Sequence, residues 1–165
     1  MRQVVLDTET TGLSWERGNR VVEIGCIELV NRFPTGRTFH HYIHPQGRAI
    51  NPEAQAVHGI SLEHLEGKPG FHEIAEEFLA YIEGAKLIAH NAGFDIGFIN
   101  AEFGRLGHPA VGPDRVVDTL ALARRKHPMG PNSLDALCRR YGIDNSRRTK
   151  HGALLDSELL AEVYV

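Results

Sequence analysis

The chain has 165 residues, 42% of them apolar, which suits one globular domain with a single core. Its formal net charge of -3 and pI of about 6.4 argue against a protein that holds nucleic acid by bulk positive charge. They do not exclude a nuclease, because bound divalent cations neutralise clustered acids. Cys26 and Cys138 form no Cys-x-x-Cys pair and indicate a reducing compartment. With no signal peptide and no long apolar run, we expect a cytoplasmic protein without membrane contact.

The first half of the chain predicts three strands. Residues 2–9 form a nearly continuous apolar run that ends in acids, which is typical of a central strand buried on both faces. Residues 20–31 and 37–44 follow as the second and third strands, with a turn between them at Pro34-Thr35-Gly36. Short turns between three successive strands predict an antiparallel meander.

The second half alternates helices with short strands. Asn51-Pro52 starts a first helix, Ser61 a short second one, and residues 71–82 have the apolar spacing of an amphipathic helix. The later elements are a strand at 86–90, a helix at 94–106, a strand at 115–117, and helices at 119–126, 132–141 and 152–165. This order predicts two parallel strands joined by right-handed crossovers.

Together these elements predict an α/β domain that spans residues 1–165. Its sheet would be mixed and five-stranded, with three antiparallel and then two parallel strands, and helices would flank it. The last helical pattern ends without a cap or a breaker. We therefore expect the chain to be a piece of a longer protein, trimmed at its C-terminus.

Asp7 and Glu9 stand at the end of the first predicted strand. Alternate side chains of a strand share a face, so both carboxylates would point the same way. Two adjacent carboxylates repel unless a cation or a proton lies between them, and hard divalent cations bind such oxygen ligands. For this pair alone, a strand that ends in a polar turn is the simpler interpretation. Whether the pair belongs to a metal site therefore depends on the other acids of the chain.

Two further acidic sites lie where later elements begin. Asp95 follows the strand at 86–90, and ligands gather at the carboxyl ends of strands in open α/β sheets. His151 and Asp156 are five residues apart, so they converge only if His151 lies in the loop before the last helix. Asp156 lies among leucines, where a buried acid needs a partner such as a metal ion. An ordinary helix acid at Asp95 and an ordinary loop histidine at His151 are the alternatives.

Five motifs together resemble the DEDD superfamily of 3′→5′ exonucleases, in the DnaQ-like variant with histidine at the last motif. They follow in order along nearly the whole chain: Asp7-Thr8-Glu9-Thr10-Thr11-Gly12, Val57-His58-Gly59, residues 90–98, residues 132–138 and residues 151–156. Within the superfamily they are most similar to the catalytic domains of the proofreading epsilon subunits of bacterial DNA polymerase III. The resemblance implies a ribonuclease-H-like fold, in agreement with the predicted sheet.

The resemblance also implies hydrolysis with two divalent metal ions, Mg²⁺ or Mn²⁺. Asp7, Glu9 and Asp156 would hold them, and Asp95 would complete the second site directly or through water. Ions about 3.5–4 Å apart stabilise both the attacking and the leaving oxygens of an in-line displacement. His151 would be the general base that deprotonates the attacking water, and a nucleoside 5′-monophosphate would leave.

The nucleotide contacts that the resemblance assigns are Thr10, Thr11, Gly12, Leu13, His58, Asn91 and Phe94. Glycine allows close backbone approach, Leu13 would wedge against a base, and Phe94 would stack on one unless it is a core aromatic. Asp118 would orient His151 or a neighbouring acid, or else cap a helix. The basic residues within 139–150 would face a phosphate backbone or form a solvated surface.

The function implied is that of a 3′→5′ exodeoxyribonuclease that proofreads single-stranded or frayed DNA 3′ ends. A ribonuclease-T-like or oligoribonuclease-like enzyme would use the same metal chemistry on RNA and differ in its tolerance of the 2′-hydroxyl. A non-catalytic nucleic-acid-binding module on the same fold is the third alternative, and the presence of all four acids and the histidine argues against it.

Two protein partners follow from the resemblance as expectations. In the epsilon-subunit family, a tail beyond the catalytic domain binds the alpha subunit of DNA polymerase III. We expect that partner for the parent protein, since these residues include no such tail. Some members also bind a small accessory subunit, and the residues leave open whether this chain does.

Overall fold

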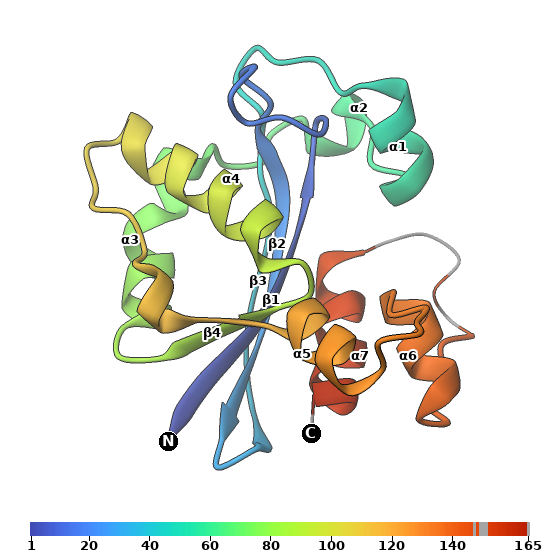
Figure 1. The fold of residues 1–165 in the computed structure, drawn as a ribbon. Coiled ribbons are helices and arrows are strands. Elements are labelled where there is room, and N and C mark those ends of the chain that lie inside the picture. The colour runs from blue at the N-terminus through green and yellow to red at the C-terminus, as the bar shows by residue number, and fades with distance from the viewer. Residues whose placement is uncertain (147, 149–151, 165) are drawn as a thin grey trace.

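A five-stranded mixed sheet is the centre of the computed structural model, which describes residues 1–146, 148 and 152–164 (Figure 1). Its strands are β1 (Arg2–Thr10), β2 (Val21–Val30), β3 (Phe33–Tyr42), β4 (Lys86–Ala89) and β5 (Val116–Asp118), in the order β3-β2-β1-β4-β5. β1 and β3 pair with β2 in antiparallel fashion, whereas β4 pairs with β1 and β5 in parallel. The predicted mixed sheet is therefore confirmed.

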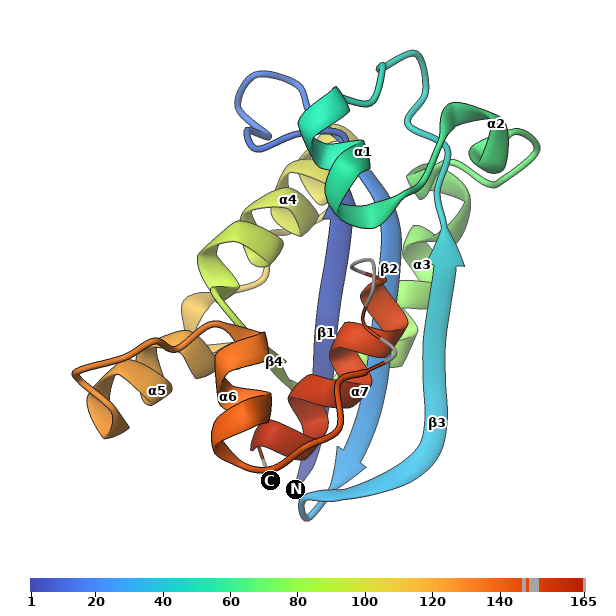
Figure 2. The same ribbon diagram turned by 90° about the vertical axis from the view of Figure 1, so that its right-hand side faces the viewer.

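Helices cover both faces of the sheet (Figure 2). They are α1 (Pro52–His58), α2 (Leu62–Leu65), α3 (Phe71–Ile82), α4 (Ala92–Arg105), the 3-10 helix η1 (Pro113–Arg115), α5 (Thr119–Lys126), α6 (Leu134–Arg140) and α7 (Ala153–Tyr164). Each helix predicted from the sequence is present within two residues of its expected start. Among the described residues, no helix has the length and apolar character that crossing a membrane requires.

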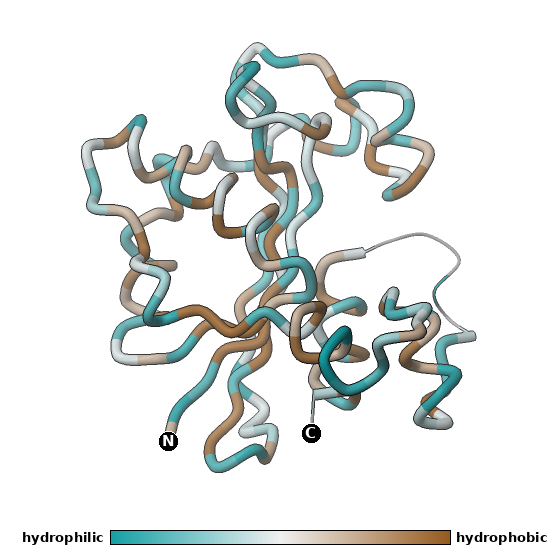
Figure 3. Tube along the Cα trace, in the orientation of Figure 1, coloured by the Kyte–Doolittle hydropathy of each residue, from teal (hydrophilic) through white to brown (hydrophobic). Residues whose placement is uncertain are grey.

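Two apolar clusters lie on opposite faces of the sheet. Val4 and Leu6 of β1 pack with α3 and α4, whereas Val5 packs with α6 and α7. Figure 3 shows that apolar residues, drawn in brown, lie along the central strands. Because alternate side chains of a strand point to opposite faces, Asp7 and Glu9 share the face of Val5, which α7 covers.

The turn between β2 and β3 lies earlier than the sequence predicts. Asn31 and Arg32 have positive φ angles of 50° and 70°, as both central residues of a type I′ hairpin turn do. Pro34-Thr35-Gly36, which we expected to be the turn, lies inside β3 where its register against β2 shifts. That prediction was wrong because proline and glycine signal bulges as well as turns.

Gly25, in the middle of β2, allows α7 to approach the sheet closely. It lies directly opposite Asp7 in the ladder, and a Cβ there would lie 2.3 to 2.5 Å from backbone atoms of the first turn of α7. Ser157 Oγ donates to the Gly25 carbonyl at 2.7 Å, and Glu23 Oε1 accepts from the Ala153 N–H at 3.0 Å. A glycine inside a strand often marks such an approach of another backbone, and here it places α7 beside the end of β1.

We expect Gly25→Ala to destabilise the fold. The added Cβ would press against backbone, which cannot move aside as the end of a flexible side chain can, and overpacking of this kind costs about 1–3 kcal/mol. A urea titration should show a lower unfolding midpoint. Gly104→Ala in α4, where nothing lies within 4 Å of the new Cβ, is the matched control and should be stabilising by about 0.5–1 kcal/mol. An unchanged midpoint for Gly25→Ala would contradict the close approach of α7.

Candidate active site

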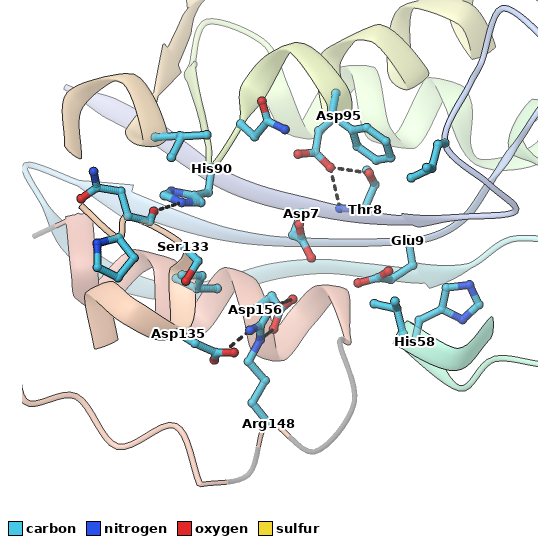
Figure 4. Close-up of a pocket in the computed structure, with 18 of the residues that line it drawn as sticks. Asp7, Thr8, Glu9, His58, His90, Asp95, Ser133, Asp135, Arg148 and Asp156 are labelled. Carbon is cyan, nitrogen blue, oxygen red and sulfur yellow. Dashed lines mark hydrogen bonds and ion pairs between the residues drawn. The ribbon is translucent and has the colours of Figure 1, made fainter. Parts of the chain in front are cut away.

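Four carboxylates meet in one cleft at the carboxyl ends of β1 and β4 (Figure 4). The cleft has a volume of about 1000 Å³, and Asp7 and Glu9 of β1, Asp95 of α4 and Asp156 of α7 all line it. One ligand oxygen from each of Asp7, Glu9 and Asp156 lies within 4.8 Å of the others. Asp95 lies beside them, and its Oδ1 accepts hydrogen bonds from the Thr8 hydroxyl and from the Thr8 N–H at 3.1 Å. The structure thus brings together the four acids that the sequence singled out.

Burial, together with the charges of neighbouring acids, raises the pKa of Asp7, Glu9 and Asp95. Burial is the main cause of the raised pKa of Asp7, and the charges of Asp95 and Glu9 add to it. Burial, followed by the charge of Asp156, raises the pKa of Glu9 to about 9. Burial also raises the pKa of Asp95 to about 7, although hydrogen bonds oppose the rise. Without a cation, the folded site therefore keeps protons that exposed carboxylates lose below neutral pH.

The metal-free protein should consequently be more stable near pH 5 than near pH 8. Glu9 and Asp95 keep their protons in the folded state up to about pH 9 and about pH 7, whereas in the unfolded chain they lose them near pH 4. The folded state binds more protons across this window, so its stability falls as the pH rises through it. We expect calorimetry in EDTA to show a melting temperature several degrees lower at the higher pH. A melting temperature that rises over the same interval would contradict these shifts.

The donor set suits a hard divalent cation. Asp7 Oδ2 is buried and has no hydrogen-bond partner among the described residues, and such an atom costs free energy unless something binds it. Mg²⁺ and Mn²⁺ prefer carboxylate oxygens, and a positive charge between the acids would offset the burial and the repulsion that raise the pKa of Asp7 and Glu9. Asp7, Glu9 and Asp156 are the described residues that fit such an ion.

Comparisons with known proteins show which family this chain belongs to. A family model described as Exonuclease matches residues 4–164. DNA polymerase III subunit epsilon of Escherichia coli is 53% identical over 171 residues, which takes in 99% of this chain and 70% of that protein. The same subunit of Rickettsia felis is 51% identical over 168 residues, with 100% of this chain and 73% of that protein covered.

The chain belongs to the exonuclease family of DNA polymerase III epsilon subunits.

Solved structures agree with the assignment to this epsilon-subunit family. Exonuclease X in complex with 5′ overhanging duplex DNA is 27% identical, with a TM-score of 0.71 over 98% of this chain and 88% of that one. The nuclease domain of 3′hExo, a DEDDh family member bound to rAMP, shares the fold at 17% identity, with a TM-score of 0.78 over 99% and 89% of the two chains. The epsilon-family domain is therefore a 3′→5′ exonuclease that acts on DNA and uses divalent metal.

The loop after β1 forms one wall of the cleft of this epsilon-family domain. Thr10, Gly12 and Leu13 line the cleft, and the Leu13 side chain is 85% exposed at its rim. Thr11 is buried, and its hydroxyl donates to Asn19 Oδ1 at 2.9 Å and accepts from the backbone of the same loop. A Cβ on Gly12 would lie 2.4 Å from Asn51 Nδ2, so a larger residue there would have to displace the Asn51 side chain. Thr11 and Gly12 thus shape the wall that Leu13 presents to a ligand.

His58 supports this wall from α1. Its Nδ1 accepts a hydrogen bond from the Ile60 N–H at 2.9 Å, so in the neutral ring Nε2 carries the proton. That nitrogen donates to the Thr10 carbonyl at 3.0 Å. We assigned His58 to nucleotide contact; it lies in the cleft lining, and its observed bonds position the end of β1.

The turn from β4 into α4 forms the opposite wall. Asn91 has a positive φ of 63°, and its N–H donates to Asp118 Oδ1 at 3.0 Å. The same oxygen accepts from the Leu120 N–H at 3.0 Å, so Asp118 caps α5, as the simpler of its two interpretations predicted. Phe94 lines the cleft and also packs against the core, with its ring centroid 4.9 Å from that of Phe98. Asn91 and Phe94 thus both line the cleft, and their contact with a nucleotide stays a prediction.

His151, the predicted general base, lies outside the described residues, as does any contact between it and Asp118. The chain is described on both sides of it, at Arg148 and Gly152, and the Gly152 carbonyl accepts from the Asp156 N–H at 2.8 Å. Arg148 lines the cleft, where its guanidinium contacts Asp156. From the sequence, this arginine belongs to the basic stretch that would face a phosphate backbone or form a solvated surface. No local signal separates it from the other basic residues within 139–150.

Proposed function

We propose that the domain removes 3′-terminal nucleotides from single-stranded or frayed DNA as nucleoside 5′-monophosphates, with two Mg²⁺ or Mn²⁺ ions, and so proofreads replication. The observation that carries the proposal is the convergence of Asp7, Glu9 and Asp156 within 4.8 Å, around a buried oxygen of Asp7 that has no hydrogen-bond partner in the part of the chain that the structure describes. It is supported by 53% identity to an epsilon subunit over nearly the whole chain.

In this proposal Asp7, Glu9 and Asp156 hold the ions, and Asp95 completes the second site directly or through water. When bound, two such ions stabilise negative charge on the attacking and leaving oxygens. His151 removes the proton of the attacking water, for which an imidazole suits because its unperturbed pKa is close to neutrality. The rest of the cleft lining orients the terminal nucleotide over the acids.

Selectivity for mispaired ends follows from capture of a single strand. A mispaired terminus unpairs at a lower free-energy cost than a matched one, so it enters the cleft more often. The formal net charge of -3 gives the domain little general attraction to DNA. The chain spans about 70% of the length of the E. coli relative. We therefore infer that residues 1–165 are the catalytic domain, and that binding to the polymerase alpha subunit brings the full-length protein to the growing 3′ end.

Digestion of matched substrates tests this proposal. The substrates are 5′-labelled DNA hairpins with a paired or mispaired 3′ end, a single DNA strand and an RNA strand of the same sequence. With Mg²⁺ we expect 3′-end ladders from the single DNA strand and the mispaired hairpin, slower digestion of the paired hairpin, and slowest digestion of RNA. Faster cleavage of RNA would favour an RNA-trimming enzyme, and no cleavage by folded protein would favour a binding module.

A further inference from the structure

Arg148 places a buried guanidinium in the active-site cleft (Figure 4). Its side chain is 8% exposed, and it lies in the connection between α6 and α7. Nε and Nη2 donate to the two carboxylate oxygens of Asp156 at 2.6 and 3.1 Å. Nη1 contacts Asp135 Oδ1 of α6 at 2.8 Å. A planar guanidinium suits this two-pronged contact, and a lysine would lose the second hydrogen bond.

Both described neighbours of the segment that carries His151 are tied to Asp156. Arg148 is tied through its side chain, and Gly152 through its carbonyl, which accepts from the Asp156 N–H. Asp135 holds the guanidinium from the other side, so one ion chain joins α6, the connection and α7.

The same guanidinium is positively charged beside a site that suits a metal ion. Burial and neighbouring acids raise the pKa of Asp7 and Glu9, and the charge of Arg148 opposes that rise. A carboxylate has about four lone-pair positions, so Asp156 can bind the guanidinium and a cation at once. The two positive charges would nevertheless repel each other, and the guanidinium would weaken metal binding.

We propose that Arg148 is a positioning residue for hydrolysis, which holds the Asp156 side chain in place while it shares the Asp156 carboxylate with the divalent ion. This inference rests on the proposed function. It has a distinctive consequence: loss of the guanidinium should strengthen metal binding, because a like charge is removed, and should slow turnover, because the tie is lost. Loss of a side chain that only stabilises the fold would not strengthen metal binding and slow turnover at the same time.

Two glutamine substitutions test the proposal. Arg148→Gln removes the charge and the hydrogen bonds to Asp156, and Arg105→Gln makes the same charge change at an exposed position in the last turn of α4, outside the cleft lining. In a calorimetric titration without DNA, we expect Arg148→Gln to bind Mn²⁺ about three- to tenfold more tightly than wild type. We expect its kcat on single-stranded DNA to fall about 10–100-fold with KM within about twofold. Arg105→Gln should leave Mn²⁺ affinity and kcat within about twofold of wild type.

Weaker Mn²⁺ binding by Arg148→Gln, or an unchanged kcat, would overturn the proposal. A loss confined to KM would also overturn it, because that pattern indicates contact with the phosphate backbone. If Arg148→Gln does not fold, Arg148→Lys serves as the test variant, because it keeps the charge without the paired hydrogen bonds. A wild-type kcat in Arg148→Lys would then overturn the proposal. A wild-type protein that releases no nucleotide would instead refute the proposed function itself.

Discussion

Asp7→Asn is expected to abolish nucleotide release and yet to raise the stability of the metal-free protein. The amide keeps the size of the side chain but removes a charge that burial and the neighbouring acids Asp95 and Glu9 disfavour. Without that charge, a divalent ion loses a ligand, so turnover should fall about 10³-fold or more. In EDTA near pH 8, the melting temperature should rise by several degrees. Calorimetry with and without Mn²⁺, beside a nucleotide-release assay, measures both effects.

Glu102→Gln is the matched control for this prediction, because Glu102 is a buried acid with a cationic partner. Arg20 donates to it through Nε and Nη2, at distances down to 2.6 Å, so the substitution leaves a largely buried arginine without its counter-charge. We expect it to destabilise the protein by about 3–5 kcal/mol. If Asp7→Asn also lowers the melting temperature in EDTA, repulsion does not dominate the cluster, and the case for a cation between the acids loses its main physical support.

His151→Gln is expected to lower kcat by about 10²–10⁴-fold while metal and DNA binding persist. The family motif gives His151 the role of general base, and the proton that it would take belongs to the attacking water rather than to a ligand. Single-turnover rates measure the chemical step, and titrations with Mn²⁺ and with a labelled oligonucleotide measure the two binding steps.

His72→Gln, at an exposed position of α3, controls for the general effect of replacing a histidine. It should leave kcat and both affinities unchanged. A His151→Gln variant with a near-normal chemical rate would remove that residue from the mechanism. Loss of Mn²⁺ binding in the same variant would make it a metal-site residue instead.

The acids of the site were predictable because five motifs in order resemble those of the exonuclease family, and local rules agree with where these acids lie. Asp7 and Glu9 are two residues apart on a strand and so share a face. Asp95 was placed by the general tendency of ligands to gather at the carboxyl ends of neighbouring strands. Asp156 was a candidate because leucines surround it in the sequence, and an acid on a buried helical face needs a partner.

Features that depend on the approach of distant segments were not predictable in this way. In the sequence, Gly25 is only a glycine that would destabilise a strand, and the close packing of α7 against it is visible only in the fold. Arg148 is one of several basic residues within 139–150, and only the fold shows that it meets Asp156. The hydrogen bonds of Thr11 and His58 that support the loop after β1 are likewise visible only in the fold, and the contact of both residues with a nucleotide stays a prediction.

Release of nucleoside 5′-monophosphates from a 5′-labelled single-stranded DNA tests the central claim most directly. The products are separated by chromatography after incubation with Mn²⁺, with Mn²⁺ and excess EDTA, and with Asp7→Asn in place of the wild type. We predict stepwise shortening from the 3′ end and deoxynucleoside 5′-monophosphates in the first reaction only. Cleavage that continues in EDTA or in Asp7→Asn, or products that carry a 3′-phosphate, would contradict metal-dependent hydrolysis at the cluster of Asp7, Glu9 and Asp156.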